Sequence, residues 1–540
     1  MLPARGSGGH SGVPPIALHP LLAAAYPVVF LFAQNVAEQV TLQPLWLPLV
    51  AAVLAGAVAL LIGRIVAGDW LRGALLATLA LALFFSFGHA WNGLGELLGQ
   101  RRWLIAAYAV VGAAAAYLVW RGGRWVAAAS RFVAVVLAIG CLINAWSIAT
   151  FTLAGRQAVA AEGPPIDVRV GELGRPDIYF IVMDRYAGAE TLRSQYGYDN
   201  TPFRDALRQR GFAVADDAWA NYLKTALSLS STLSADFLDG EALAAAADEG
   251  REVAASYELL QSHLAVPATL QSLGYEYVHV GSYWEPTGTN PYADRVIGSS
   301  RGDQFSSALL STTALSLLSP PLEPGERTIE AWGTGKEFTL REFDHVAETA
   351  RLEGPTFVFS HFLVPHPPYY FDTDGSSPTE EERAERSEEE EYVRQLQWTN
   401  GKILDMLDAL LDVPDGRQPI IVLAADEGPF PAEFAADERD FDWTKATPAQ
   451  IERKYGILNA VHLPGVDPAD AGFNDRSSPV NTFRYIMNAY FNADLAPLPD
   501  VSFLSPDYAH LYDFVEVERT DDGAAVPPSG GSGEGPGSGG

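Results

Sequence analysis

Long apolar stretches separated by short polar breaks fill the first 155 residues. Each stretch is long enough to cross a hydrocarbon layer of ~30 Å, which takes about 20 helical residues. Trp and Tyr lie near several of the ends, as they do at membrane interfaces. The first stretch also admits a cleaved signal peptide, although it lacks a strong basic start and an Ala-x-Ala site. The pattern predicts five membrane-spanning helices over Ile16–Ala33, Leu45–Val66, Ala74–Trp91, Trp103–Trp120 and Phe132–Leu153.

The arginines between these stretches predict the orientation. With the amino terminus in the cytoplasm, six arginines fall in inside segments and three in outside segments. Cytoplasmic loops normally carry the excess of Lys and Arg. Five spans then place everything after Gly155 on the extracytoplasmic side of a bacterial plasma membrane. The pair Arg101 and Arg102 fits this topology less well, because it would lie outside.

Two short apolar runs in the rest of the chain each end in acids. Ile178–Met183 precedes Asp184, and Ile420–Ala425 precedes Asp426 and Glu427. Continuous short apolar runs are typical of strands buried on both faces, as in a parallel sheet. Open α/β sheets bind ligands beyond the carboxyl ends of their strands. We therefore expect the three carboxylates to share one rim, where a divalent cation would offset their repulsion.

Strand-like and helical patterns alternate from Asp177 to Glu518, which predicts a large α/β domain with a mainly parallel sheet after the five-helix transmembrane domain of residues 1–155. Segments rich in Gly, Pro, Ser or Ala flank this domain, and they predict a linker over 156–176 and a disordered tail over 519–540. Further strands are expected at 278–280, 357–359 and 457–463, and long helices at Leu192–Gly211 and Glu391–Leu411.

Charge divides the chain in the same place. Residues 1–160 carry nine Arg, no Lys and three acids, a net charge of +6. The net charge of the whole chain is −30, so residues 161–540 carry −36. Nucleic acid binding needs Lys and Arg to contact phosphates, so an acidic domain argues against it. The acidic surface suits a well-solvated domain that accommodates cations.

Two segments between the acid-tipped runs carry further candidate chemistry. The Ser- and Thr-rich residues 221–233 predict a helix that begins near Thr225, where backbone N–H groups favour an oxyanion. Capping of that helix is the structural alternative. Residues 360–369 place His361 and His366 in a Pro-rich loop after an expected strand. Histidine can ligate a metal or protonate a leaving group.

The order of these features resembles the sulfatase-like branch of the alkaline phosphatase superfamily. The features are Asp184 at a strand end, Thr225 before a Ser-rich helix, the His366–Tyr369 loop and the run Asp426-Glu427-Gly428. Within that branch the chain is similar to membrane-bound lipoteichoic acid synthases and phosphoethanolamine transferases. The synthases likewise have five membrane helices followed by an extracytoplasmic catalytic domain.

The resemblance implies roles for these residues. Asp184 and Asp426 would be metal ligands, and Thr225 would be both ligand and nucleophile. Asn221 and His361 would contact the substrate, with Asn221 on a phosphoryl oxygen.

The resemblance also implies a role for His366, and this chain departs from the family pattern at one position. His366 would face the substrate, as an acid or as a ligand of a second metal. The family usually has His after the second Asp, whereas this chain has Glu427. Glu can ligate Mg²⁺ or Mn²⁺ through oxygen, so a site of Asp, Thr, Asp and Glu is expected to prefer these ions to Zn²⁺.

A Thr nucleophile predicts phosphoryl transfer. We expect a metal-dependent phosphotransferase or phosphodiesterase that acts on envelope lipid or glycopolymer phosphodiesters. Sulfatase activity is less favoured, because the usual route needs Cys or Ser oxidised to formylglycine and then Pro and Arg. The single cysteine, Cys141, falls in a predicted span, and Thr225 is followed by neither residue. The alternative is a catalytically decayed scaffold for envelope polysaccharide assembly, with Glu427 as the mark of decay.

Overall fold

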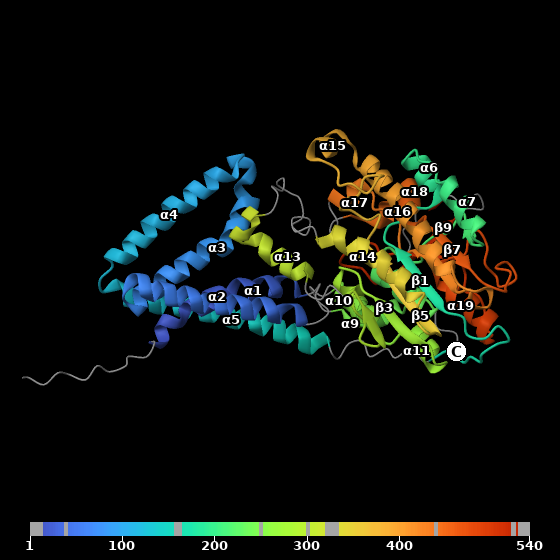
Figure 1. The fold of residues 1–540 in the computed structure, drawn as a ribbon, viewed down its shortest axis with the longest axis horizontal. Helices are drawn as coiled ribbons and strands as arrows, with labels where there is room; N and C mark the ends of the chain where they lie inside the picture. The colour runs from blue at the N-terminus through green and yellow to red at the C-terminus, as the bar shows by residue number, and fades with distance from the viewer. Residues whose placement is uncertain are drawn as a thin grey trace, which may run out of the picture. The chain divides into compact units, whose positions relative to one another are not determined.

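The chain folds into two compact units in the computed structural model (Figure 1). One unit comprises Met1–Leu153 and Gly302–Thr334, and the other comprises Ala154–Arg301 and Gly335–Gly540. The predicted tail lies almost wholly outside the described residues. The structure describes residues 14–36, 42–155, 165–247, 252–298, 303–318, 334–436, 441–519 and 525–526.

The described part of the first unit contains five helices that are long and apolar enough to span a membrane, as predicted. Close backbone packing joins α2 to α3, because a Cβ atom on Gly63 would collide with the carbonyl of Gly73. Small residues allow such close approach between membrane helices. The five helices are α1 (His19–Gln34), α2 (Gln43–Ala67), α3 (Trp70–Leu98), α4 (Arg101–Arg121) and α5 (Trp125–Gly155).

A short segment from much later in the chain belongs to the same unit. Helix α13 (Asp303–Thr312) and the 3-10 helix η3 (Ala314–Leu318) pack on α3. Phe305 meets Phe32 of α1 edge to face, with ring centroids 5.3 Å apart. Arg101 Nη1 donates a hydrogen bond of 3.1 Å to the carbonyl of Ser316. This contact gives a structural use to one of the two arginines that the predicted topology places outside.

Gly88 of α3 makes the docking of α13 possible, since a Cβ atom there would collide with the carbonyl of Ser311. We expect Gly88→Ala to lower the thermal stability of the purified chain in detergent by about 1–3 kcal/mol, the usual cost of overpacking. Gly93→Ala is the matched control in the same helix, because a Cβ atom there meets open space. Ala favours a helix over Gly by roughly 1 kcal/mol, so the control should be neutral or stabilising. Equal melting temperatures for the two variants would contradict this packing.

The described part of the second unit is built on a seven-stranded sheet with the order β2-β7-β6-β1-β5-β3-β4. The strands from β6 to β4 in that order run parallel, and β7 alone runs in the opposite direction, pairing antiparallel with β6 and with the edge strand β2. The mainly parallel sheet is therefore confirmed. The strands are β1 (Ile178–Met183), β2 (Ala213–Ala215), β3 (Glu276–Val280), β4 (Arg295–Ile297), β5 (Thr356–Phe362), β6 (Ile420–Ala425) and β7 (Asn459–His462). A second sheet contains β8 (Ser502–Leu504), β9 (Val515–Arg519) and β10 (Ala525–Val526).

Helices cover both faces of the large sheet, which explains why β1 and β6 are buried along their whole length. Phe483 of α19 packs on Phe357, with ring centroids 6.0 Å apart, and Phe343 of α14 packs on Phe362 at 4.3 Å. Successive side chains of β5 thus point to opposite faces. The helices are α6 (Ala189–Gln195), α7 (Thr201–Gln209), α8 (Thr225–Ser234), α9 (Gly240–Ala246), α10 (Ala254–Leu260), α11 (Ala265–Ser272), α12 (Glu285–Gly288), α14 (Thr334–Thr349), α15 (Glu380–Glu385), α16 (Glu388–Leu411), α17 (Ala432–Ala436), α18 (Pro448–Tyr455) and α19 (Pro479–Phe491).

The predicted helix over Leu192–Gly211 is wrong as a single element, because it is two helices, α6 and α7. Gly197 between them has φ 62°, a left-handed conformation that ends a helix. Pro202 then occupies the first turn of α7, where its missing N–H costs nothing.

Candidate active site

Strand register brings the two acid-tipped ends together. Met183 of β1 lies opposite Ala425 of β6, so the residues that follow them, Asp184 and Asp426, leave the sheet side by side. On the other side of β1, His361 of β5 lies opposite Val182. Three neighbouring strands therefore deliver three candidate ligands to one edge of the sheet.

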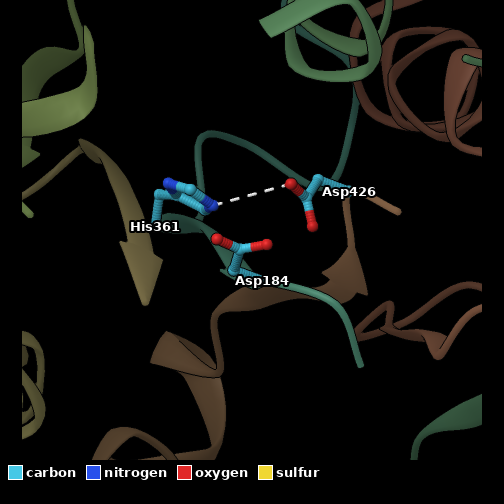
Figure 2. A group of neighbouring side chains, drawn as sticks. All are labelled: Asp184, His361 and Asp426. Atoms are coloured by element: carbon cyan, nitrogen blue, oxygen red, sulfur yellow. Dashed lines mark ion pairs between the residues drawn. The ribbon is translucent and has the colours of Figure 1, made fainter. Parts of the chain in front are cut away.

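Asp184, His361 and Asp426 form a buried group in which one potential ligand atom from each lies within 4.8 Å of the others. Figure 2 shows the three side chains turned toward one another, with His361 Nε2 3.7 Å from Asp426 Oδ2. One atom of each side chain has no hydrogen-bond partner among the described residues, namely Asp184 Oδ1, His361 Nε2 and Asp426 Oδ2. Buried polar atoms are rarely left in this state. Two carboxylates and an imidazole suit a divalent metal ion.

The two carboxylates have opposite pKa shifts. Burial and the nearby charge of Asp426 raise the pKa of Asp184 well above its usual value. Burial alone would also raise the pKa of Asp426, but the neighbouring side chains of His361 and Thr225 and the charge of Lys454 hold that pKa below its usual value. A bound cation would favour the ionised form of both.

We expect metal affinity to fall as the pH is lowered, because the cation must displace a proton from Asp184, whose pKa is raised. Below the pKa of that carboxyl, each pH unit should weaken the apparent affinity about tenfold, and above it the affinity should level off. Titration of the full chain with Mn²⁺ at several pH values would measure this. An affinity independent of pH would contradict a ligand role for Asp184.

His361 differs most from its sequence-based expectation. It was expected in a loop as a substrate contact, but β5 extends through it, and its side chain is fully buried. Its Nδ1 atom lies 3.0 Å from Thr287 Oγ1, which is in turn 2.7 Å from Ser282 Oγ. If Nδ1 carries the proton, this bond leaves the Nε2 lone pair directed at the aspartates, as in many metal-ligating histidines. Side chains alternate between the two faces of β5, so the direction of His361 could have been predicted if the strand had been extended through residue 362.

Thr225 is the first residue of α8 and is half-buried. Its side chain lies close enough to Asp426 to help lower the pKa of that carboxyl. The predicted helix start is confirmed. Lys224 has an extended backbone, and the Ser- and Thr-rich run becomes helical at Thr225. A hydroxyl at a helix amino terminus beside two carboxylates is well placed to become a nucleophile.

Glu427 lies next to the three-residue group but outside it. Its Oε1 atom accepts hydrogen bonds from Lys454 Nζ at 2.9 Å and from Arg185 Nε at 3.3 Å. Sequence reasoning missed both cations. Arg185 directly follows Asp184 and was visible in the sequence, whereas nothing in the sequence connects Lys454 with residue 427.

Asn221 and His366, the two remaining candidate residues, differ in their contacts. Asn221 is buried, and its amide bonds backbone groups at both ends, since Nδ2 donates to Val501 O and Oδ1 accepts from Val480 N. This geometry gives Asn221 a structural role, and the expected substrate contact stays a prediction. His366 is half-buried, and its backbone N–H donates to the carbonyl of Asp184, which ties its loop to the rim.

The family model that matches this chain is that of the sulfatases, over residues 176–455. The chain belongs to the sulfatase family. Together with its five apolar helices, this makes it a membrane-anchored member of the sulfatase-like branch of the alkaline phosphatase superfamily, as the sequence predicted. The family supports a hydrolase or a transferase, and membership alone does not fix the reaction. No curated protein matches the chain.

Solved structures with a similar fold include three bacterial proteins. Lipooligosaccharide phosphoethanolamine transferase A from Neisseria meningitidis is 14% identical with a TM-score of 0.38, over 88% of this chain and 96% of its own. The periplasmic domain of EcEptC from Escherichia coli, in complex with Zn, is 13% identical with a TM-score of 0.37, over 59% of this chain and 83% of its own. An alkaline phosphatase superfamily protein from Vibrio parahaemolyticus is 11% identical with a TM-score of 0.42, over 69% of this chain and 89% of its own.

Proposed function

We propose that this sulfatase-family chain is a metal-dependent phosphotransferase or phosphodiesterase that uses Thr225 as its nucleophile. The observation that carries the proposal is the placement of the Thr225 hydroxyl beside Asp426, a member of the buried group of two aspartates and a histidine. The group has unpartnered atoms suited to a cation, and the hydroxyl beside it sits at a helix amino terminus.

Asp184, His361 and Asp426 are the residues that would hold the metal, with Thr225 as a further oxygen ligand. The bound ion would supply positive charge that favours the Thr225 alkoxide and offsets charge on the phosphoryl oxygens. The expectation of Mn²⁺ or Mg²⁺ rested on Glu427 as the fourth ligand. With His361 in the set, one ligand is an imidazole nitrogen, which Zn²⁺ also accepts.

In the proposed reaction, Thr225 is the nucleophile and His366 is the proton donor. Thr225 Oγ attacks the phosphorus of a phosphodiester and passes its proton to the neighbouring Asp426 carboxylate as the new P–O bond forms. The bond from phosphorus to the leaving alcohol breaks, and His366, in the loop tied to Asp184, is the proposed donor of a proton to that alcohol. Attack by water or by an acceptor hydroxyl then releases the phosphoryl group from Thr225 and restores the enzyme.

The substrates we propose are lipids or glycopolymers of the cell envelope that carry phosphodiesters. Membrane anchoring of the chain supports this class. Phe32 near the end of α1 and Arg101 at the start of α4 contact α13–η3, and the arginine distribution predicts that these two helix ends lie outside. This agreement supports an extracytoplasmic catalytic domain.

The test is hydrolysis of bis(p-nitrophenyl) phosphate by the full chain in detergent, with Mn²⁺, Mg²⁺, Zn²⁺ or EDTA. Metal-dependent turnover is the expected result. Turnover of p-nitrophenyl sulfate alone would replace the proposal with a sulfatase. No turnover with any metal, together with an unchanged melting temperature on metal addition, would favour the decayed scaffold.

A further inference from the structure

A cluster of cations lies around one aromatic ring beside Thr225. The side-chain charges of Arg185, Lys224 and Lys454 lie 4.2, 5.1 and 3.4 Å from the centroid of Phe430. These three residues are referred to below as the basic cluster. Lys224 immediately precedes Thr225, so the cluster borders the proposed nucleophile directly.

Glu427 organises this basic cluster. The Lys454 side chain is fully buried, and its Nζ atom donates to Glu427 Oε1 at 2.9 Å and to the carbonyl of Gly428 at 3.2 Å. Arg185 Nε reaches the same carboxylate oxygen. Residue 427 therefore binds cationic side chains at the position where the family usually has a metal-ligating His.

Arg185 is held in an unfavourable backbone conformation. Its φ is 58°, in the left-handed region that residues with a Cβ atom avoid. Its N–H donates to Asp426 Oδ1 at 3.3 Å, and its carbonyl accepts from Tyr392 Oη at 2.8 Å. Strained residues persist where surrounding contacts enforce them, and they concentrate at functional sites.

The Arg185 guanidinium has donors to spare. Only Nε is hydrogen-bonded within the described residues, and 21% of the side chain is exposed. Arginine Nη groups are suited to paired hydrogen bonds with phosphate oxygens. The local charge also favours binding of an anion. A divalent cation would offset Asp184 and Asp426, while Glu427 offsets one charge of the basic cluster. The surplus is positive and faces the proposed reaction centre.

We infer that Arg185, with Lys224, binds the anionic phosphoryl oxygens of the substrate next to Thr225. Glu427 and Lys454 are positioning residues that hold Arg185. The inference rests on the proposed function and deepens it, because it assigns Glu427 to the substrate side of the site and away from the metal.

The test compares Arg185→Met with Arg417→Met in the full metal-loaded chain. Arg417 is an exposed arginine that precedes β6, at the opposite end of the strand from Asp426. Calorimetric titration with inorganic phosphate measures binding without turnover. We expect Arg185→Met to weaken phosphate binding, and to raise KM for bis(p-nitrophenyl) phosphate, by about 10- to 100-fold, the usual effect of losing charged hydrogen bonds. Arg417→Met should change neither, and Mn²⁺ affinity should stay the same in both.

Arg185→Gly guards against misfolding, because Gly adopts a positive φ without strain and the variant removes the same side chain. Phosphate binding equal to wild type in Arg185→Gly would overturn the inference, even if the enzyme turns over substrate. Loss of Mn²⁺ binding in step with phosphate binding would also overturn it, since Arg185 would then act on the metal group. Arg185-dependent phosphate binding in a chain without turnover would uphold the subsite and reject the proposed reaction.

Discussion

Replacing Thr225 by alanine should abolish metal-dependent phosphodiester hydrolysis, with a loss in kcat of at least about 10³-fold. The reason is chemical, because alanine leaves no oxygen for the phosphoryl group to join. Folding should be preserved, since Thr225 is half-buried and the capping position of α8 belongs to Lys224. Turnover by the full chain in detergent measures the effect, and the melting temperature without added metal confirms the fold.

Thr201→Ala is the matched control, since Thr201 begins α7 as Thr225 begins α8. The Thr201 hydroxyl accepts a hydrogen bond from Arg204, and the residue takes no part in the three-residue group. Its replacement should leave kcat unchanged. Thr225→Ser should retain measurable turnover, because it keeps a hydroxyl at the same place. Wild-type activity in Thr225→Ala would remove the proposed mechanism.

Loss of metal-induced stabilisation is the second large effect that we expect, in Asp184→Asn and in His361→Gln. A ligand at 100 times its Kd stabilises a protein by about 2.7 kcal/mol. Removing one member of the three-residue group should abolish most of that gain at the same Mn²⁺ concentration. Thermal unfolding of each variant with and without Mn²⁺ measures the difference.

Two variants make the ligand assignment specific. His279→Gln replaces another buried histidine, on β3, which bonds the Thr287 carbonyl and stands outside the group. It should lower stability with and without Mn²⁺ alike. Glu427→Gln should keep the metal-induced rise, because its carboxylate is bonded to Lys454 and Arg185. If Glu427→Gln loses the rise and His361→Gln keeps it, the ligand set expected from the sequence is the correct one.

The sequence predicted those features that depend on local pattern. Apolar stretches of sufficient length have few alternatives to membrane helices, and continuous apolar runs such as Ile178–Met183 have few alternatives to buried strands. Placement of Asp184 beside Asp426 also followed, because parallel strands end at one edge. The reversed direction of β7, which pairs antiparallel with β6 and with β2, could not be foreseen, since strand direction depends on the path of the connecting chain.

Partners across the fold were the harder part of the site. In a strand, His361 belongs to the metal group, whereas in a loop it was expected on the substrate side. The strand predicted at Phe357–Phe359 extends to Phe362, and the sequence carries no signal for that end. Lys454 reaches Glu427 from a helix 27 positions later in the chain. Sequence proximity carries no information on such pairs, so the departure at residue 427 looked like a changed metal ligand.

The chain's return to the first unit at α13–η3 bears on how this protein can be divided. A protease that cuts between α5 and β1 severs one connection, yet the downstream fragment still contributes Phe305 and Ser316 to the helix bundle. The two fragments should therefore stay together through purification in detergent. Releasing a soluble catalytic domain requires removal of residues 303–318 as well, and a fragment that keeps them would expose an apolar segment that the bundle normally covers.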